Sequence, residues 1–227
     1  MEELIGVSVQ GLLQIIFLDL ILSGDNAIVI AMAARNVPKD LQKRAILIGT
    51  GGAIGLRLLF AAIIVPLLKI PLIGAVGGLM LVWIAYKLLA DNHDHGDNPQ
   101  GGATVWSAVK TIIIADAVMS LDNVLALAGV AHEFVPIMIG VLISIPIIIW
   151  GSSFIMKAME KFPIIIYAGA AMLAWSAGKM IVEDKIIGGF VPSTALHLAV
   201  QIILTVAVVG VGYMKNKKMK KEQAHAA

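Results

Sequence analysis

Long apolar stretches alternate with short polar segments along almost the whole chain. There are seven such stretches, at about 7–34, 41–66, 71–90, 104–131, 135–157, 163–182 and 193–214. A helix needs roughly 20 apolar residues to cross the hydrocarbon core of a bilayer. Each stretch is therefore predicted to form a membrane-spanning helix. The pattern predicts an all-α fold, namely a polytopic membrane protein with seven transmembrane helices.

The composition supports this class of protein. Of the 227 residues, 59% are hydrophobic and 14% are charged, and the mean hydropathy is +0.92. A soluble domain is typically about 45–50% apolar. The chain has no cysteine, which excludes disulfides, thiolate metal sites and cysteine nucleophiles. Glu2 and Glu3 stand where a cleavable signal carries basic residues, so we expect the first stretch to be retained as a helix.

The basic residues gather on one side of this predicted membrane protein. They flank the first, third and fifth connections and follow the last stretch, and they are Arg35, Lys39, Lys43, Arg44, Lys87, Lys110, Lys157, Lys161, Lys215, Lys217, Lys218, Lys220 and Lys221. The opposite side has Lys69, Lys179 and Lys185. By the positive-inside rule, the N-terminus is predicted to lie outside and the C-terminus in the cytoplasm. Residues 1–214 are then expected to form a single transmembrane domain. Residues 215–227 form a basic cytoplasmic tail that we expect to bind anionic lipid rather than nucleic acid.

The two halves of the chain resemble each other. Pro71 to Leu89 aligns without gaps with Pro163 to Ile181, and the matched pairs are Pro71/Pro163, Gly77/Gly169, Met80/Met172, Trp83/Trp175 and Lys87/Lys179. The predicted repeat units are residues 7–90 and 104–182, with one extra helix at 193–214. Each unit has three helices, so the second enters the membrane from the opposite side. Such an inverted 3+3 repeat places a binding site at the interface between the units, near mid-membrane.

Both halves carry the same polar motif inside an apolar stretch. The eight residues are Asp19, Ser23, Asp25 and Asn26 in the first half, and Asp116, Ser120, Asp122 and Asn123 in the second. An ionised Asp at the bilayer centre costs roughly 3 kcal/mol, so four of them indicate a function. Carboxylate, hydroxyl and amide oxygens suit hard cations such as Mg²⁺, Ca²⁺ or Mn²⁺. We predict that these eight residues form a metal site.

Gly24 predicts an interruption in the first helix. In a straight helix, Asp19, Ser23 and Asn26 share one face and Asp25 points away. Glycine tolerates local unwinding, and an unwound turn would free backbone carbonyls for the cation. The second motif has Leu121 at the equivalent position, so its interruption should be weaker or absent and the site asymmetric.

Arg57 lies in the middle of the second stretch and is the predicted counter-charge. About nine apolar residues into the helix, it is too deep to reach water easily, so it should pair with an acid of the site. The four negative charges of the ionised carboxylates would still exceed the two positive charges of one divalent ion. Protons would neutralise the remainder, which makes metal/proton exchange compatible with the site.

Other interpretations of the motifs stay open. In a scaffold or assembly protein, the polar groups would only link the helices. An amino-acid exporter needs a cationic side chain to bind the carboxylate of its substrate. This core has one arginine and four aspartates, which favours a cation over an amino acid as the substrate. An intramembrane aspartyl protease would need Gly in place of Leu22 and Tyr in place of Ala115, so we expect no enzyme. The loop His93–Asp97 could bind metal loosely, although a solvated loop is the simpler interpretation.

The segments Asp19 to Ala27 and Asp116 to Val124, with the basic connection leading into Gly49 through Arg57, resemble the TerC family, especially its short YjbE-like bacterial branch. The resemblance covers nearly the entire chain. It implies a seven-helix member of the LysE transporter superfamily, in the bacterial cell membrane, which exports Mn²⁺ and binds no permanent cofactor. The metal pathway that it implies consists of Asp19, Asp25, Asn26, Asp116, Asp122 and Asn123. The expected partners are the transported cation and the lipid bilayer. A homo-oligomer is compatible with the pattern.

Overall fold

The computed structural model describes residues 9–67, 70–90, 104–130, 134–191 and 193–226, and every regular element in this part of the chain is helical. The elements are α2 (Val9–Leu22), α3 (Gly24–Ala34), α4 (Lys39–Leu67), α5 (Ile73–Ala90), α6 (Val105–Val130), α7 (Phe134–Lys161), α8 (Ile164–Glu183), the 3₁₀ turn η1 (Gly188–Phe190) and α9 (Thr194–Ala226). The predicted all-α class is confirmed.

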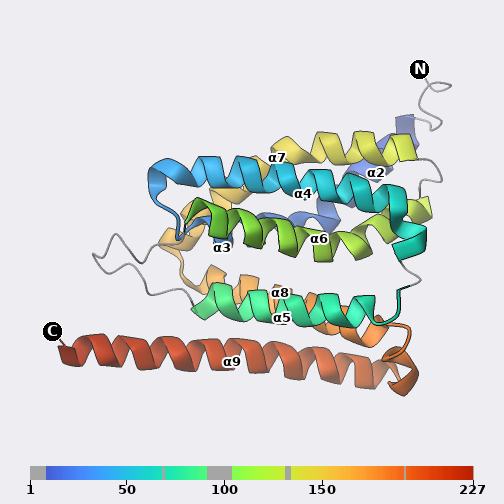
Figure 1. Ribbon diagram of the computed structural model, residues 1–227. Helices are drawn as coiled ribbons and strands as arrows, with labels where there is room; N and C mark the ends of the chain where they lie inside the picture. Colours follow the sequence, from blue (N-terminus) through green and yellow to red (C-terminus); the bar gives the residue numbers. More distant parts are fainter. Residues whose placement is uncertain (1–8, 68–69, 91–103, 131–133, 192, 227) are drawn as a thin grey trace.

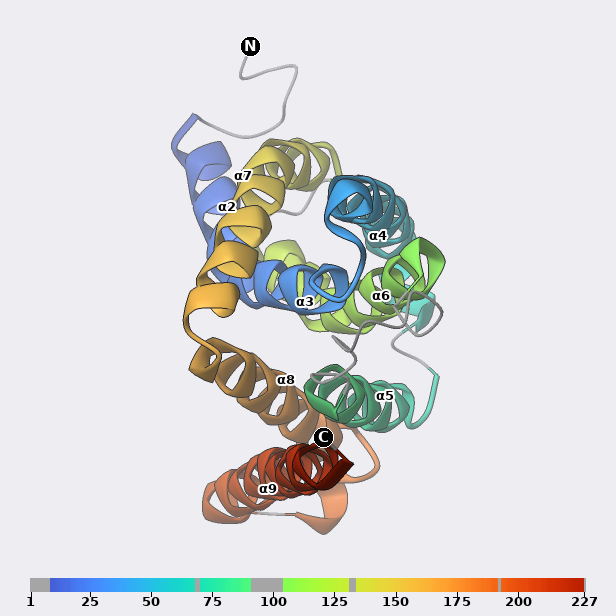
Figure 2. The ribbon, with the colours of Figure 1, turned by 90° about the vertical axis from the view of Figure 1, so that its left-hand side faces the viewer.

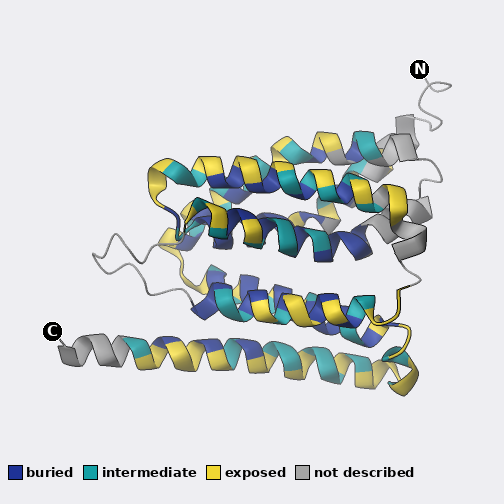
Figure 3. Cartoon of the chain, viewed as in Figure 1, coloured by how far each residue is buried: buried dark blue, intermediate teal, exposed yellow. Residues whose placement is uncertain are grey.

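Four of the described helices are long and apolar enough to cross a membrane. They span Ile73–Ala90, Met138–Lys161, Ile164–Glu183 and Thr194–Met219. Many large apolar side chains on the helices face outwards, among them Phe17, Trp150 and Ile203, which are 67%, 74% and 68% exposed. In Figure 3, exposed positions recur along the outer faces of α4, α5 and α9. Apolar surface of this extent is what lipid would cover, and the chain is a multi-pass membrane protein.

The helices form two groups that lie side by side (Figures 1 and 2). In the larger group, α4 packs along α6, and α7 packs along α2 and α3. In the smaller group, α5 packs along α8, and α9 covers both. The groups meet where α3 contacts α8 and where α5 contacts α6. Each predicted repeat unit therefore contributes its first two helices to one group and its third to the other.

The predicted interruption in the first apolar stretch is present. α2 ends at Leu22 and α3 begins at Gly24, with Ser23 at φ −101° and ψ 2° between them. The interruption is local, because the Ser23 N–H still donates to the Asp19 carbonyl at 2.8 Å. In the second motif, α6 runs through Leu121 as one helix, as the sequence predicted.

Glycines allow close helix contacts on both sides of α8. A Cβ at Gly78 of α5 would lie 2.6 Å from the Ala177 carbonyl oxygen of α8. A Cβ at Gly169 of α8 would lie 2.7 Å from the Met32 sulfur of α3. Small residues allow the backbones of membrane helices to approach in this way. These contacts hold α8 between α5 and the larger group.

The basic ends of the helices lie at the same end of the molecule. Figure 1 shows the start of α4, the end of α5, the start of α6 and the ends of α7 and α9 on one side. Lys39 and Glu160 form an exposed ion pair there, with 3.5 Å between Nζ and Oε1. The predicted gathering of positive charge is therefore present. The predicted orientation of that end in the membrane stays a prediction, and Lys69 and the loop His93–Asp97 lie outside the described residues.

Candidate functional site

A polar cluster lies inside the larger helix group, built from both predicted repeat units. Asp19 comes from the last turn of α2 and Ser23 from the interruption that follows it. Arg57 comes from α4, and Asp116 and Ser120 come from α6. All five side chains are buried, and Asp19, Ser23 and Ser120 are fully inaccessible. Their burial in an apolar interior requires that they satisfy one another.

The guanidinium group of Arg57 lies at the centre of this cluster. Its Nη1 donates to Asp19 Oδ1 at 3.3 Å and to Ser23 Oγ at 2.9 Å. Its Nη2 donates to Asp116 Oδ1 at 2.7 Å, and its Nε donates to Ser120 Oγ at 3.1 Å. Arg57 therefore pairs with acids of the motifs, as the sequence predicted. One guanidinium joins the same Asp-x-x-x-Ser unit from each half of the chain.

The formal charges of the cluster do not cancel. If all three groups are ionised, two carboxylates and one guanidinium leave a net charge of −1. Ser120 Oγ also donates to Asp116 Oδ2 at 3.1 Å, which stabilises that carboxylate. In an apolar interior, such charges interact far more strongly than in water. The cluster is therefore a site where cations are favoured and where displacement of Arg57 leaves two carboxylates available.

Ser144 and Thr50 are members of this site that the sequence analysis did not identify. Ser144 of α7 is fully buried, and its hydroxyl donates to Asp19 Oδ2. Thr50 of α4 is also buried, and its hydroxyl has no hydrogen-bond partner among the described residues. Both line a cavity of about 10 Å³ beside Arg57 and Asp116, room for about one water molecule. The only signal in the sequence was that Ser144 is the single hydroxyl between Phe134 and Trp150.

Of the other motif residues, Asp25 and Asn26 form no hydrogen bond to Arg57 among the described residues. Asp25 is half-buried in the first turn of α3, and its Oδ1 accepts the Asn26 N–H at 2.9 Å. Asn26 is buried, and its side-chain amide has no partner among the described residues. Asn123 is buried on α6, and the side chain of Asp122 lies outside the described residues. The metal-ligand role of all eight residues stays a prediction. Within the part of the chain that the structure describes, no three His, Cys, Asp or Glu side chains converge on one point.

A further buried carboxylate joins α8 to α5 at the end of the molecule opposite the basic helix ends. Asp184 directly follows α8, and its Oδ2 accepts the Ala75 N–H at 3.3 Å while its Oδ1 accepts the Ile186 N–H at 3.0 Å. Burial acts to raise the pKa of Asp184, but hydrogen bonds from Ile186, Ala75, Ile187 and Gly74 outweigh it and hold that pKa below its usual value. Asp184 is therefore a structural carboxylate, outside the cluster around Arg57.

Comparison with known proteins agrees with this architecture. The model of the family described as "Integral membrane protein TerC family" matches residues 6–221. The chain is 44% identical over 199 residues to "Uncharacterized membrane protein YjbE" of Bacillus subtilis, covering 87% of this chain and 91% of that protein. It is 26% identical to "UPF0053 inner membrane protein YoaE" of Escherichia coli K12, over 92% of this chain and 44% of that protein. The chain thus spans less than half the length of this longer relative. No solved structure matches.

Proposed function

Because the chain belongs to the TerC family of integral membrane proteins, we propose that it is a membrane transporter that exports a hard divalent cation, specifically Mn²⁺, from the bacterial cytoplasm. The cation passes through the buried cluster around Arg57, in exchange for protons. One observation carries the proposal: a single buried guanidinium joins equivalent aspartates, Asp19 and Asp116, from the two halves of the chain. A cluster that served only to link helices could use uncharged groups at far lower insertion cost.

The guanidinium and the transported ion compete for the same oxygen atoms. Arg57 contacts Asp19, Asp116, Ser23 and Ser120, which are four of the eight proposed ligand residues. An entering divalent ion would displace Arg57 from both carboxylates and leave a neutral site, since its charge of +2 balances theirs. When the ion leaves, Arg57 returns and prevents the carboxylates from being buried unpaired. Arg57 thus occupies the carboxylate oxygens of the site whenever no metal ion is bound.

The donor atoms around Arg57 decide which class of ion the site suits. They are carboxylate and hydroxyl oxygens, to which Ser144 and Thr50 add two more hydroxyls from α7 and α4. Such all-oxygen sites suit Mg²⁺, Ca²⁺ and Mn²⁺, whereas thiolate ligands would suit Zn²⁺ or Cu⁺. The choice of Mn²⁺ among the hard cations rests on the resemblance of the motifs and not on the geometry.

We further propose seven membrane crossings arranged as an inverted repeat with one extra helix. The contacts between helices support this arrangement. α4 packs along α6, and the equivalent α7 packs along α2 and α3. α5 contacts α6, and the equivalent α8 contacts α3. A two-fold relation between residues 7–90 and 104–182 would produce these paired contacts.

Reporter fusions test the crossings and the orientation together. Fusions after Lys39, within His93–Asp97 and after Lys157 should report a cytoplasmic location. Fusions near Lys69 and Glu183 should report an external location. A cytoplasmic signal at Glu183 would contradict the inverted repeat, because it would place both ends of α8 on one side of the membrane.

Transport by purified protein in liposomes tests the function. The full-length protein should move Mn²⁺ across the bilayer, with proton movement in the opposite direction recorded by a pH-sensitive dye. Asp19→Asn and Asp116→Asn should each abolish Mn²⁺ movement. Asp40→Asn is the matched control, since Asp40 is exposed at the start of α4, and it should transport normally. Movement of a basic amino acid but not of Mn²⁺ would overturn the proposal, as would full activity of both site variants.

A further inference from the structure

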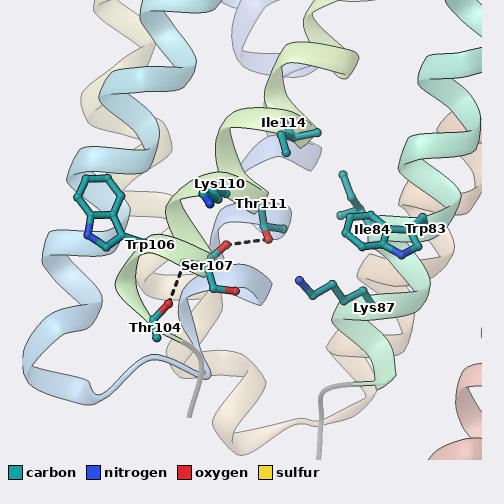
Figure 4. A pocket seen from close by; sticks show the side chains of 9 residues that line it. All are labelled: Trp83, Ile84, Lys87, Thr104, Trp106, Ser107, Lys110, Thr111 and Ile114. Carbon is teal, nitrogen blue, oxygen red and sulfur yellow. Dashed lines mark hydrogen bonds between the residues drawn. The ribbon is translucent and has the colours of Figure 1, made fainter. Parts of the chain in front are cut away.

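A second pocket lies between α5 and α6, away from the cluster around Arg57. It has a volume of about 340 Å³, within the range typical of small-ligand sites. Two lysines, two tryptophans and hydroxyl-bearing side chains line it, namely Lys87, Lys110, Trp83, Trp106, Ser107 and Thr104. Figure 4 shows that Lys87 extends from α5 towards the first turns of α6, where the hydroxyl groups lie. None of the residues of the transport site lines it.

The pocket carries positive charge that the described protein does not neutralise. Among the described residues, no carboxylate pairs with Lys87 or Lys110. The ammonium group of Lys87 lies 5.3 Å from the centre of the Trp83 ring, which holds it over the pocket wall. Lys110 is exposed in the second turn of α6. Ammonium groups and hydroxyl donors suit the oxygen atoms of a phosphate group.

The position of the pocket favours a phosphate that is part of a lipid. It lies between the last turns of α5 and the first turns of α6, at the end of the molecule where the basic helix ends gather. Trp83 and Trp106 are 57% and 65% exposed, and exposed tryptophans are typical of the level of the lipid headgroups. Ile114, which is partly exposed, provides an apolar surface along which an acyl chain can continue into the bilayer.

We propose that this pocket binds the phosphate headgroup of an anionic phospholipid, with Lys87 and Lys110 as its two cationic contacts. Trp83 lies beside the glycerol region, and the hydroxyl of Ser107 or Thr104 donates to a phosphate oxygen. Basic pockets between membrane helices on the cytoplasmic side bind lipid headgroups in this manner. The proposal concerns a lipid site and does not depend on which ion the protein transports.

Tryptophan fluorescence can report on the pocket directly. The chain has four tryptophans, and two of them line the pocket. In a Trp150→Phe/Trp175→Phe background, the emission therefore comes from Trp83 and Trp106 alone. This protein, in detergent, is titrated with brominated phosphatidylglycerol, brominated phosphatidylcholine or sodium phosphate. Native mass spectrometry of the same samples counts the lipids that stay bound.

We expect phosphatidylglycerol to quench the emission in a saturable manner, and phosphatidylcholine to quench it weakly. Lys87→Gln/Lys110→Gln should weaken phosphatidylglycerol binding roughly 30-fold, because each lysine near an anionic lipid contributes roughly a factor of five. Lys43→Gln/Lys161→Gln is the matched control. It also removes two exposed charges from the same end, and the Lys161 ammonium likewise lies over a ring, that of Phe162, at 5.5 Å. This control should bind phosphatidylglycerol normally.

Three results would overturn the proposal. The first is equal quenching by both lipids. The second is equal loss of phosphatidylglycerol binding in the pocket variant and the control, which would indicate general surface attraction. The third is displacement of the lipid by millimolar phosphate, which would identify a site for a soluble anion. Lys87→Arg/Lys110→Arg keeps both charges. If this variant still binds phosphatidylglycerol, the weaker binding of Lys87→Gln/Lys110→Gln results from the lost charge and not from misfolding.

Discussion

The buried cluster predicts that Arg57 is needed for stability only while its acidic partners are charged. Arg57→Met keeps most of the side-chain volume and removes the charge, so that Asp19 and Asp116 lose their common cation. Removing one partner of a buried ion pair typically costs about 3–5 kcal/mol, because the other charge stays buried without compensation. We therefore expect Arg57→Met to lower the free energy of unfolding by about 3–5 kcal/mol.

Neutralising the acids should reverse most of that loss. The triple variant Asp19→Asn/Asp116→Asn/Arg57→Met removes all three groups of the paired cluster together. Replacing a complete buried ion pair by uncharged groups is often neutral or stabilising. The triple variant should therefore be more stable than Arg57→Met, although it carries more substitutions. Equilibrium unfolding in mixtures of SDS and mild detergent measures the three free energies.

Ile46→Ala provides the control for simple loss of packing. Ile46 is buried on the same helix as Arg57, at 2% exposure, and its truncation should cost about 2–5 kcal/mol. That cost should be the same with or without Asp19→Asn/Asp116→Asn, because these changes do not alter its contacts. If the triple variant were as unstable as Arg57→Met, the destabilisation would come from lost packing, and the electrostatic reasoning would be refuted.

Three further predictions concern other parts of the molecule. Asp25→Asn and Asp122→Asn should each abolish protection of cells against excess Mn²⁺ while the protein still reaches the membrane, as measured by growth assays and membrane immunoblots. Gly78→Ala should destabilise the protein by about 1–3 kcal/mol in detergent unfolding, because its Cβ would meet backbone at 2.6 Å. Gly151→Ala, with nothing within 4 Å of the new Cβ, should not. The pKa of Asp184 is held below its usual value in the folded protein. Asp184 therefore contributes fully to stability at a pH above the usual pKa of an aspartate, and this contribution is lost as the pH falls through the lower pKa of the folded state. Asp184→Asn should therefore lower stability at pH 7 but not at strongly acidic pH, as measured by unfolding across a pH series.

The sequence predicted much of this architecture because its strongest signals are local. The length and apolarity of each stretch predict the helices. The first motif has Gly24 where the second has Leu121, and this difference predicts which motif is interrupted. Depth in an apolar run also predicts that Arg57 needs an acidic partner. Each of these inferences uses only residues within one helix, so no knowledge of helix packing is required.

The parts that the sequence did not predict depend on how the helices pack. The repeat makes Asp19 and Asp116 equivalent, but only the packing of α6 against both α4 and α2 brings both within reach of one guanidinium. Ser144 belongs to the site because the packing of α7 turns this hydroxyl towards Asp19. The pocket between α5 and α6 is likewise formed by helices of different groups. A helical pattern fixes which residues share a face, but not which neighbour that face meets.

The sharing of one arginine by two acids constrains the order in which the chain can enter the membrane during synthesis. Asp19 and Arg57 are 38 residues apart, so they can enter as a neutral pair on adjacent segments. Asp116 follows 59 residues after Arg57, and residues 104–182 contain no arginine. The second half therefore has no arginine of its own to pair with Asp116, whose charge costs roughly 3 kcal/mol at the bilayer centre. Asp116 finds its buried partner only when α4 is in place, so the first half of the chain supplies the cation around which the second half assembles.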